Sequence, residues 1–416
     1  MKISKESLKN IFSYQNFVLA VFCFLIASIP LFSFNAKLSI LTWGIAIVLF
    51  GMMGIWFLVK KKFSFDFVNI ALILFGVLCV VSSLVNGMRG FNFTPILMCL
   101  SMAIIYSYCK ASGSGKKMLF SAWISVIIFL LVFLFKYRSQ IISLDFSTRF
   151  GGVFGDENDV AFLLAFGLAM SVYVFFFKGK ILMKVASAVL SVLFFGAGFL
   201  TASKIFIFLS FFAFLICLFA YFGKKHWWIS LLVLAGLALI ILVLFLLPPF
   251  ESIRRRFVMF FTTLFTDNSG SMNSQNDIST VLRFDMFLAG LEMFLRKPLF
   301  GYGVWGFATY GGINNGWSHN HISEGLCNFG ILGFAAFHIP FIYCSSKLFK
   351  NRKSANKNDA LLFILLIGFF LVTGISIPLY TQKLFAFLSG PVLAIVEVND
   401  VLAFKFKKKE VQLACE

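Results

Sequence analysis

Charged residues are scarce in this 416-residue chain: Asp, Glu, Lys and Arg together make up 13% of it. Hydrophobic residues make up 60%, and 59 residues are Phe. A water-soluble domain of this length does not need so much apolar surface. The composition therefore excludes an ordinary globular protein and predicts one that is solvated by lipid.

The eight cysteines show no CxxC pair and no other spacing typical of a metal site. Most of them lie inside apolar runs, where a free thiol packs like a small hydrophobic side chain. We therefore interpret the cysteines as buried thiols rather than as metal ligands.

Long apolar runs, by contrast, recur along the whole chain. Runs of about 17–25 apolar residues can cross a bilayer as helices. We count twelve such runs, at 14–34, 38–59, 66–85, 93–109, 118–136, 159–177, 181–201, 204–222, 227–248, 321–345, 359–377 and 383–401. The sequence thus predicts an all-α, polytopic integral membrane protein, with a single membrane-embedded domain over 1–416 and a large loop at 249–320 that carries short helices.

Basic residues fall mainly on alternate connections between these runs. Each of the intervening short connections carries a single basic residue: Lys37, Arg89, Lys204 and Lys383. Because cytoplasmic loops are enriched in Lys and Arg, this alternation predicts cytoplasmic termini and a periplasmic large loop. The net charge of +19 then reflects contact with anionic headgroups, and no nucleic-acid-binding module accompanies it.

Some basic residues nevertheless lie on the side where they are disfavoured. Arg149 is in the loop at 137–158, and Arg283 begins a stretch whose apolar residues predict a helix over 283–296, just before Pro298. Positive charge kept on this side suggests that it holds an anion. Alternatively, Arg283 is a solvated charge and Lys204 extends only to the membrane interface.

Three consecutive arginines occupy 254–256 near the start of the large loop. They stand among Phe and Met residues, which is typical of an interfacial helix with arginines at the headgroups. The alternative is a clamp for an anionic lipid or a pyrophosphate.

Polar residues cluster at 318–320, where the large loop re-enters the membrane, and His319 and His321 form an HxH pair. A metal site needs further ligands, for which the candidates are Asp156, Glu157, Asp159 and Glu324. The histidines could instead be hydrogen-bonded surface residues, or His319 could be a general base. In that case we expect His319 in the first helical turn with Ser318 as a possible cap, because a helix N-terminus keeps imidazole neutral.

The glycines at 301, 303 and 306 match a GxGxxG pattern. No βαβ unit surrounds them, so a dinucleotide-binding loop is not indicated. We interpret them as turns in which backbone segments pack closely.

The motifs, taken in order, resemble those of the O-antigen ligase/polymerase superfamily. The family pattern is an Arg before a Gly-rich turn with Asn, a T-x-S-R turn, an Arg-led helix before P-x-x-G-x-G, and [SA]-H-N before G-x-x-G. The matching residues are Arg149, Gly155 and Asn158; Thr201, Ser203 and Lys204; Arg283, Pro298, Gly301 and Gly303; and Ser318, His319, Asn320, Gly330 and Gly333. The resemblance covers about 145–335, and Lys204 stands where the family usually has Arg.

The resemblance implies a metal-independent, GT-C-like glycosyltransferase of the bacterial inner membrane that uses no cofactor. Its donor would be a glycan linked to undecaprenyl diphosphate, and His319 and Arg283 would be catalytic. The substrate-binding residues would be those at the other motif positions: Arg149, Lys204, Asn158, Asn320 and Ser203. Basic residues can hold two phosphates, and no close pair of carboxylates suggests a retaining glycosidase.

The expected reaction is the inverting polymerisation of repeat units of O-antigen, capsule or exopolysaccharide at the periplasmic face, with a lipid-linked glycan as acceptor. A chain-length regulator would be a possible partner. The alternative is an O-antigen ligase that transfers the glycan to lipid A-core in lipopolysaccharide biosynthesis, or a protein oligosaccharyltransferase. A lipid-linked glycan flippase remains as a non-enzymatic alternative, although no inverted repeat supports it.

Overall fold

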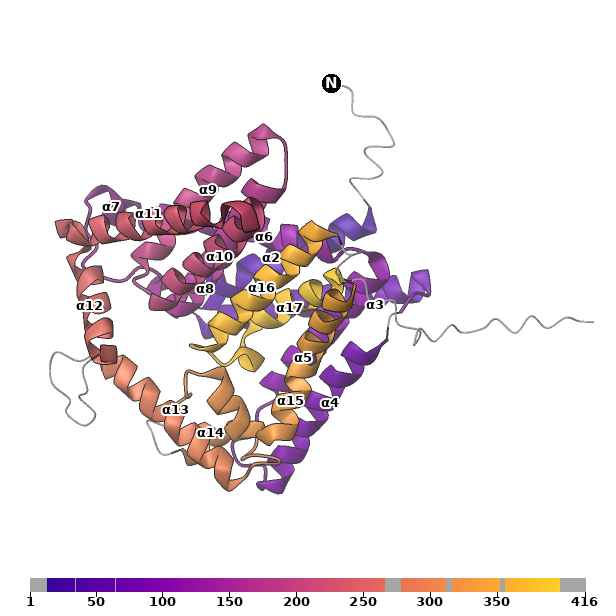
Figure 1. The fold of residues 1–416 in the computed structure, drawn as a ribbon. Helices are drawn as coiled ribbons and strands as arrows, with labels where there is room; N and C mark the ends of the chain where they lie inside the picture. The colour runs from indigo at the N-terminus through magenta and orange to yellow at the C-terminus, as the bar shows by residue number, and fades with distance from the viewer. Residues whose placement is uncertain are drawn as a thin grey trace, which may run out of the picture.

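The computed structural model describes residues 13–33, 35–63, 65–265, 278–311, 316–351 and 356–396. Within these ranges eleven helices are long and apolar enough to cross a membrane (Figure 1). They are α2 (Tyr14–Ser33), α3 (Ala36–Lys60), α4 (Phe67–Val85), α5 (Thr94–Ser112), α6 (Gly115–Lys136), α8 (Glu157–Phe177), α9 (Ile181–Leu200), α10 (Lys204–Phe222), α11 (Trp227–Leu246), α15 (His321–Lys350) and α16 (Lys357–Gly374).

The predicted all-α, polytopic membrane fold is confirmed. The twelfth predicted run, 383–401, contains the shorter apolar helix α17 (Lys383–Ile395), and the end of that run lies outside the described residues. At about 1.5 Å per residue, α17 is about 20 Å long, shorter than a ~30 Å hydrocarbon core. Nearly all of its side chains are buried, so α17 is a core helix packed against α5 and α6.

The spans differ in how much of their surface the protein covers. In α8, 83% of the apolar window is buried, whereas in the span that contains α11 only 17% is buried. An apolar surface as exposed as that of α11 is unfavourable in water and suits contact with lipid tails. Therefore α8 is a central helix and α11 a peripheral one.

The shorter helices lie in the connections. They are α7 (Arg138–Ile142), η1 (Gly152–Phe154), η2 (Lys224–His226), η3 (Pro248–Phe250), α12 (Glu251–Phe265), α13 (Ile278–Arg296), α14 (Gly306–Tyr310) and η4 (Leu379–Thr381). In Figure 1, α12 and α13 form one edge of the molecule and lead to α14. The helix expected over 283–296 begins earlier, at Ile278. We call the end of the bundle that carries this large loop the loop end.

Helix α15 is broken at Gly330, whose φ and ψ are 63° and −172°. His321 and His338 are seventeen positions apart, which would separate them by about 25 Å along a straight helix. Their ring centroids are only 5.1 Å apart. The segments before and after Gly330 therefore fold back on each other. The second segment, 331–350, is about 30 Å long, which is enough to cross a bilayer.

The turn at 298–303 supplies backbone partners for the broken helix. Tyr302 N donates to Cys327 O at 2.9 Å, and Ile331 N donates to Pro298 O at 2.8 Å. Unpaired backbone groups are costly within a membrane, so irregular backbone is tolerated there only where protein or water satisfies it. The turn thereby allows α15 to be broken inside the bundle.

Two glycines make this close approach possible. A Cβ atom on Gly301 would lie 2.5 Å from Cys327 O, and one on Gly330 would lie 2.3 Å from Leu299 O. Both distances are shorter than real Cβ contacts, and both glycines have a positive φ. The interpretation of the glycines at 301 and 303 as close-packing turns agrees with this geometry.

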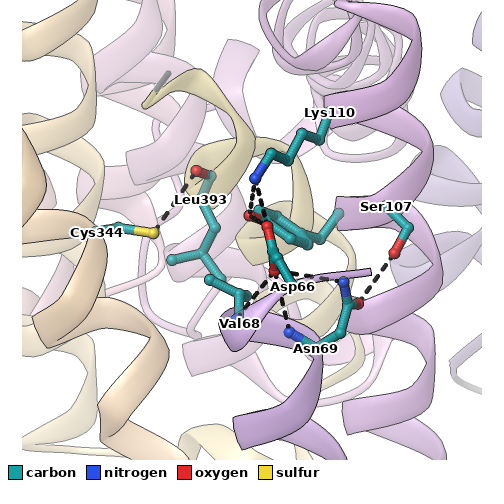
Figure 2. Close-up of polar contacts among 8 residues, drawn as sticks. Asp66, Val68, Asn69, Ser107, Lys110, Cys344 and Leu393 are labelled. Carbon is teal, nitrogen blue, oxygen red and sulfur yellow. Dashed lines mark hydrogen bonds and ion pairs between the residues drawn. The ribbon is translucent and has the colours of Figure 1, made fainter. Parts of the chain in front are cut away.

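At the opposite end of the bundle, a buried carboxylate joins α4 to α5 (Figure 2). Asp66 caps α4 by accepting a hydrogen bond from Val68 N at 3.0 Å. Its other carboxylate oxygen accepts from Tyr106 OH at 2.7 Å and pairs with Lys110 Nζ. Asn86, just beyond the other end of α4, donates to Gly301 O at 2.9 Å, which fixes α4 to the loop end.

Candidate functional site

Two turns at the loop end are held together by side chains. Arg149 Nε donates to Thr201 O at 3.1 Å, and Ser203 Oγ donates to Asn158 Oδ1 at 2.9 Å. The first bond joins the turn before α8 to the turn before α10, and the second joins the first turn of α8 to the N-cap residue of α10. The structure thus brings together Arg149, Asn158 and Ser203, and Ser203 is hydrogen-bonded to Asn158.

Arg149 also pairs with a carboxylate of α8. Its Nη1 lies 3.3 Å from Glu157 Oε2, and both side chains are partly buried. The neighbouring Asp156 caps α8 by accepting a hydrogen bond from Asn158 N at 2.6 Å. The guanidinium of Arg149 is therefore fixed in place from two sides.

Lys204 is the first residue of α10 and extends toward the helices of the large loop. Its Nζ donates to Thr280 Oγ1 at 3.1 Å and lies 4.6 Å from the centroid of the Phe260 ring. It also lies within electrostatic range of Arg149, Arg256 and Arg283. Lys204 therefore joins the site rather than extending away from it.

Arg283 lies in the second turn of α13, and its Nη1 is 3.4 Å from Ser376 Oγ in the turn after α16. Burial lowers the pKa of the Arg283 guanidinium; the Asp156 carboxylate opposes this effect and the charge of Arg149 adds to it. Because the ordinary pKa of arginine lies far above neutral pH, the group remains a cation. The geometry thus places a partly buried positive charge near Arg149.

Arg256 belongs to the same group, although sequence reasoning did not separate it from its two neighbours. Burial lowers the pKa of Arg256, Arg149 and Arg283 act in the same direction, and Glu157 opposes them. Arg255, by contrast, is exposed and pairs with Glu251 at 2.6 Å. Helical spacing could have indicated Arg256, which lies beside the buried Ile253 and Phe257 on α12.

We call these four residues the cation cluster: Arg149, Lys204, Arg256 and Arg283. They come from four different connections or helices. Arg256 and Arg283 form no ion pair with a carboxylate in the ranges that the structure describes. Arg256 and Arg283 repel each other, and Arg149 adds to that repulsion. A bound anion would relieve it.

A cleft of about 630 Å³ opens beside the cluster, between the loop around 144–147 and α12. Arg256 lines this cleft together with Asp145, Ser147 and Glu251. Ser252 Oγ donates to Ser147 O at 3.2 Å and joins the two walls. Of the cluster residues, Arg256 is the one that reaches this cleft.

His319 lies within electrostatic range of Arg283 and has a left-handed backbone, with φ of 54°. Such a conformation costs a non-glycine residue about 1–3 kcal/mol. Burial lowers the pKa of His319 below its ordinary 6.5; Arg283 acts in the same direction and Asp156 opposes them. The imidazole is therefore neutral at pH 7 and able to accept a proton.

The expectation that Ser318 caps the helix, with His319 in its first turn, is wrong. Asn320 is the cap: its Oδ1 accepts hydrogen bonds from Ile322 N at 2.9 Å and Ser323 N at 3.1 Å. Its Nδ2 donates to Ile375 O at 3.3 Å. His319 therefore precedes the helix, and its burial beside Arg283, not a place in the first turn, lowers its pKa.

Ser318, the residue before His319, is hydrogen-bonded to the carboxylate of Glu324. Glu324 Oε2 accepts from Ser318 N at 2.7 Å and from Ser318 Oγ at 3.0 Å, and its Oε1 accepts from Tyr380 OH at 2.8 Å. Tyr380 OH in turn accepts from Asn328 Nδ2 at 2.8 Å. Sequence reasoning considered Glu324 only as a metal candidate, and nothing in the spacing indicated Tyr380.

His321 has different surroundings from His319. It is buried, its Nδ1 accepts from Leu379 N at 3.2 Å, and its ring packs against Phe337 and His338. In the described ranges no three His, Cys, Asp or Glu side chains lie close enough to hold a metal ion. The HxH pair thus does not form one site.

Residues 189–338 match the protein-family model that is described as O-Antigen ligase. The matched segment runs from within α9 to the second part of α15, so it contains Lys204, Arg256, Arg283 and His319. Arg149 and Asn158 lie before it. No curated protein matches the chain.

Proposed function

We propose that this chain, which carries an O-antigen ligase family segment at 189–338, transfers a glycan from a polyprenyl diphosphate to a hydroxyl acceptor. Members of this family transfer lipid-linked glycans. The observation that carries the proposal is the cation cluster beside a neutral His319. The first group suits a diphosphate, and the second suits the proton of an attacking hydroxyl.

The cation cluster holds the donor diphosphate. Arginine offers paired N–H donors that fit phosphate oxygens, and such charge-assisted bonds are stronger than neutral ones. Negative charge grows on the diphosphate as its bond to the sugar breaks, so fixed cations stabilise the transition state more than the ground state. Asn158, Ser203 and Asn320 serve this site by fixing the turns and the helix end around it.

His319 acts as the general base. Its imidazole accepts the proton of the acceptor hydroxyl while that oxygen forms a bond to the anomeric carbon. The bond from this carbon to the phosphate oxygen breaks, and the diphosphate leaves with the electron pair. A single displacement of this kind inverts the anomeric configuration.

Metal independence is part of the proposal, because Arg and Lys supply the positive charge that a divalent ion supplies in other phosphate chemistry. Purified enzyme is expected to keep its activity in EDTA. Loss of activity that Mg²⁺, Mn²⁺ or Zn²⁺ restores would contradict this part.

We further propose that the loop end faces the periplasm of a bacterial inner membrane. The alternation of basic residues along the sequence supports this orientation. In a background without reactive cysteines, an impermeant thiol reagent should label Thr148→Cys in intact spheroplasts. Lys61→Cys, exposed at the opposite end, is the matched control and should react only after the membrane is breached. The reverse pattern would overturn the orientation.

Polymerisation of lipid-linked repeat units is the proposed reaction, supported by the likeness of the turns at 151–158 and 201–204 to polymerase motifs. The family description favours a second candidate, the ligase that transfers the glycan to lipid A-core. Deletion with analysis of surface glycan separates the two: loss of a polymerase leaves core plus one unit, and loss of a ligase leaves bare core. Transport of the lipid-linked glycan by the purified protein without bond formation would contradict both.

A further inference from the structure

The imidazole of His319 makes no hydrogen bond with any other residue that the structure describes. Its position is therefore set by its own backbone. That backbone is left-handed, with φ of 54°, a region that a residue with a Cβ atom rarely adopts. Something must hold the chain in this shape if the imidazole is to point at an acceptor.

Ser318 is fixed on the side that precedes His319. The residue is fully buried, and both its backbone N–H and its hydroxyl lie within hydrogen-bond distance of Glu324 Oε2, at 2.7 and 3.0 Å. The backbone N–H of Asn320 donates to Ser318 Oγ at 3.2 Å. The loop at 318–320 is thus closed around one hydroxyl, and His319 is the residue that protrudes from it.

Glu324 is itself held firmly. It is only 2% exposed, and its second oxygen accepts from Tyr380 OH at 2.8 Å. Tyr380 lies in η4, and the same connection contacts Arg283 through Ser376 Oγ and Asn320 through Ile375 O. The carboxylate therefore joins the loop of His319 to the connection that also contacts the cation cluster.

We propose that Glu324 is the positioning residue of the base: through Ser318 it fixes the left-handed backbone of His319 and so aims the imidazole. This inference rests on the proposed function of His319. Glu324 does not touch the substrate and acts only through His319. A misplacement of reacting groups by about 1 Å can cost about 10²-fold in rate.

A double-mutant cycle tests this role with purified protein and a lipid-linked donor. Glu324→Ala is expected to lower kcat about 10²-fold with little change in the KM of the donor, because the cation cluster is intact. In a His319→Ala background, Glu324→Ala is expected to lower kcat no further, since a residue that acts only through the base has nothing left to position. Tyr380→Phe keeps the carboxylate but loses one of its partners, and should give a smaller loss of the same kind.

Glu292→Gln is the matched control, because this glutamate is exposed and, among the residues that the structure describes, forms an ion pair with Arg296 on the same helix. It should retain the wild-type kcat. The proposal would be overturned if Glu324→Ala lowered kcat by the same factor in the wild-type and His319→Ala backgrounds. It would also be overturned if Glu324→Ala changed only the KM of the donor. If Glu324→Ala does not fold, the same comparison with Tyr380→Phe decides. A fully active His319→Ala protein would instead show that the proposed base itself is wrong.

Discussion

Charged side chains gather at both ends of this bundle, and the two groups are built differently. At the opposite end, Lys110 meets Asp66, and both oxygens of that carboxylate also accept hydrogen bonds, from Val68 N and Tyr106 OH (Figure 2). At the loop end, Arg256 and Arg283 stand beside other cations and form no ion pair within the described ranges.

This difference indicates which group of charges is balanced without a ligand. A buried charge whose partners are all present contributes to the structure, and its removal leaves the other charge uncompensated. At the loop end, the repulsion among Arg149, Arg256 and Arg283 destabilises the free protein, and a bound anion would relieve it. Variants at the two ends should therefore have opposite effects on stability and activity.

The largest expected effect is that of His319→Ala. Loss of a general base typically lowers kcat about 10²–10⁴-fold, and folding should be unaffected because the imidazole has no described hydrogen bond. His321→Ala should have a smaller effect on kcat and a larger one on stability, since His321 is buried against Leu379 and His338. The measurement is kcat and thermal midpoint for both proteins; full activity of a well-folded His319→Ala protein would refute the assignment.

Arg283→Ala should separate activity from stability most clearly. The loss of one charge-assisted bond to the leaving diphosphate is expected to lower kcat/KM about 10–100-fold. The thermal midpoint should stay the same or rise, because one of several repelling cations is gone. Arg283→Lys should also be impaired, since a paired donor is replaced by a point charge, whereas Lys204→Arg should be tolerated. A falling midpoint with unchanged kcat/KM would make Arg283 structural.

The opposite end should show the reverse pattern. Asp66→Ala leaves Lys110 and Tyr106 without their acceptor and removes the cap of α4, which is expected to cost about 1–3 kcal/mol. Asp66→Asn keeps a capping oxygen and should lose less. The folded fraction of both proteins should keep wild-type kcat. Unfolding in detergent, measured beside activity, checks this; a specific loss of kcat at full stability would place function at this end too.

The smallest predicted effect is a shift in pH dependence. His319 must be neutral to accept a proton, so kcat falls as pH drops through its pKa, which lies below the ordinary 6.5. Asp156 raises this pKa, so Asp156→Asn, which still caps α8, should move the acidic limb to lower pH. Arg283 lowers it, so the residual activity of Arg283→Gln should have its acidic limb at higher pH. Limbs that do not move in these directions would exclude His319 as the titrating base.

Long apolar runs in the sequence were enough to predict the membrane fold. The grouping of the distant motifs in one site came from the family resemblance. The sequence did not predict the break at Gly330. A glycine in an apolar run does not reveal that Pro298 and Cys327 will supply partners for an interrupted helix. Helix α15 therefore consists of two segments, although the sequence predicted one continuous run over 321–345.

The missed site residues have separate physical causes. Tyr380 reaches Glu324 only because α15 folds back and η4 lies beside it, an arrangement with no sequence periodicity. Ser318 and Asn320 are both good capping residues, and the choice between them depends on the unusual backbone of His319. Arg256 could have been found from its position beside Ile253 on the buried face of α12.

The central claim is that Arg256 and Arg283 bind the diphosphate of a lipid-linked donor. Its most direct test is the thermal stability of purified protein while undecaprenyl diphosphate is titrated, with uncharged undecaprenol as the control. Wild type and Asp66→Asn should be stabilised at the same diphosphate concentrations, and undecaprenol should have no comparable effect. Arg283→Ala should need at least about tenfold more undecaprenyl diphosphate for the same stabilisation, which corresponds to about 1.4 kcal/mol of binding free energy. Equal titrations for wild type and Arg283→Ala, or equal stabilisation by undecaprenol, would contradict the account.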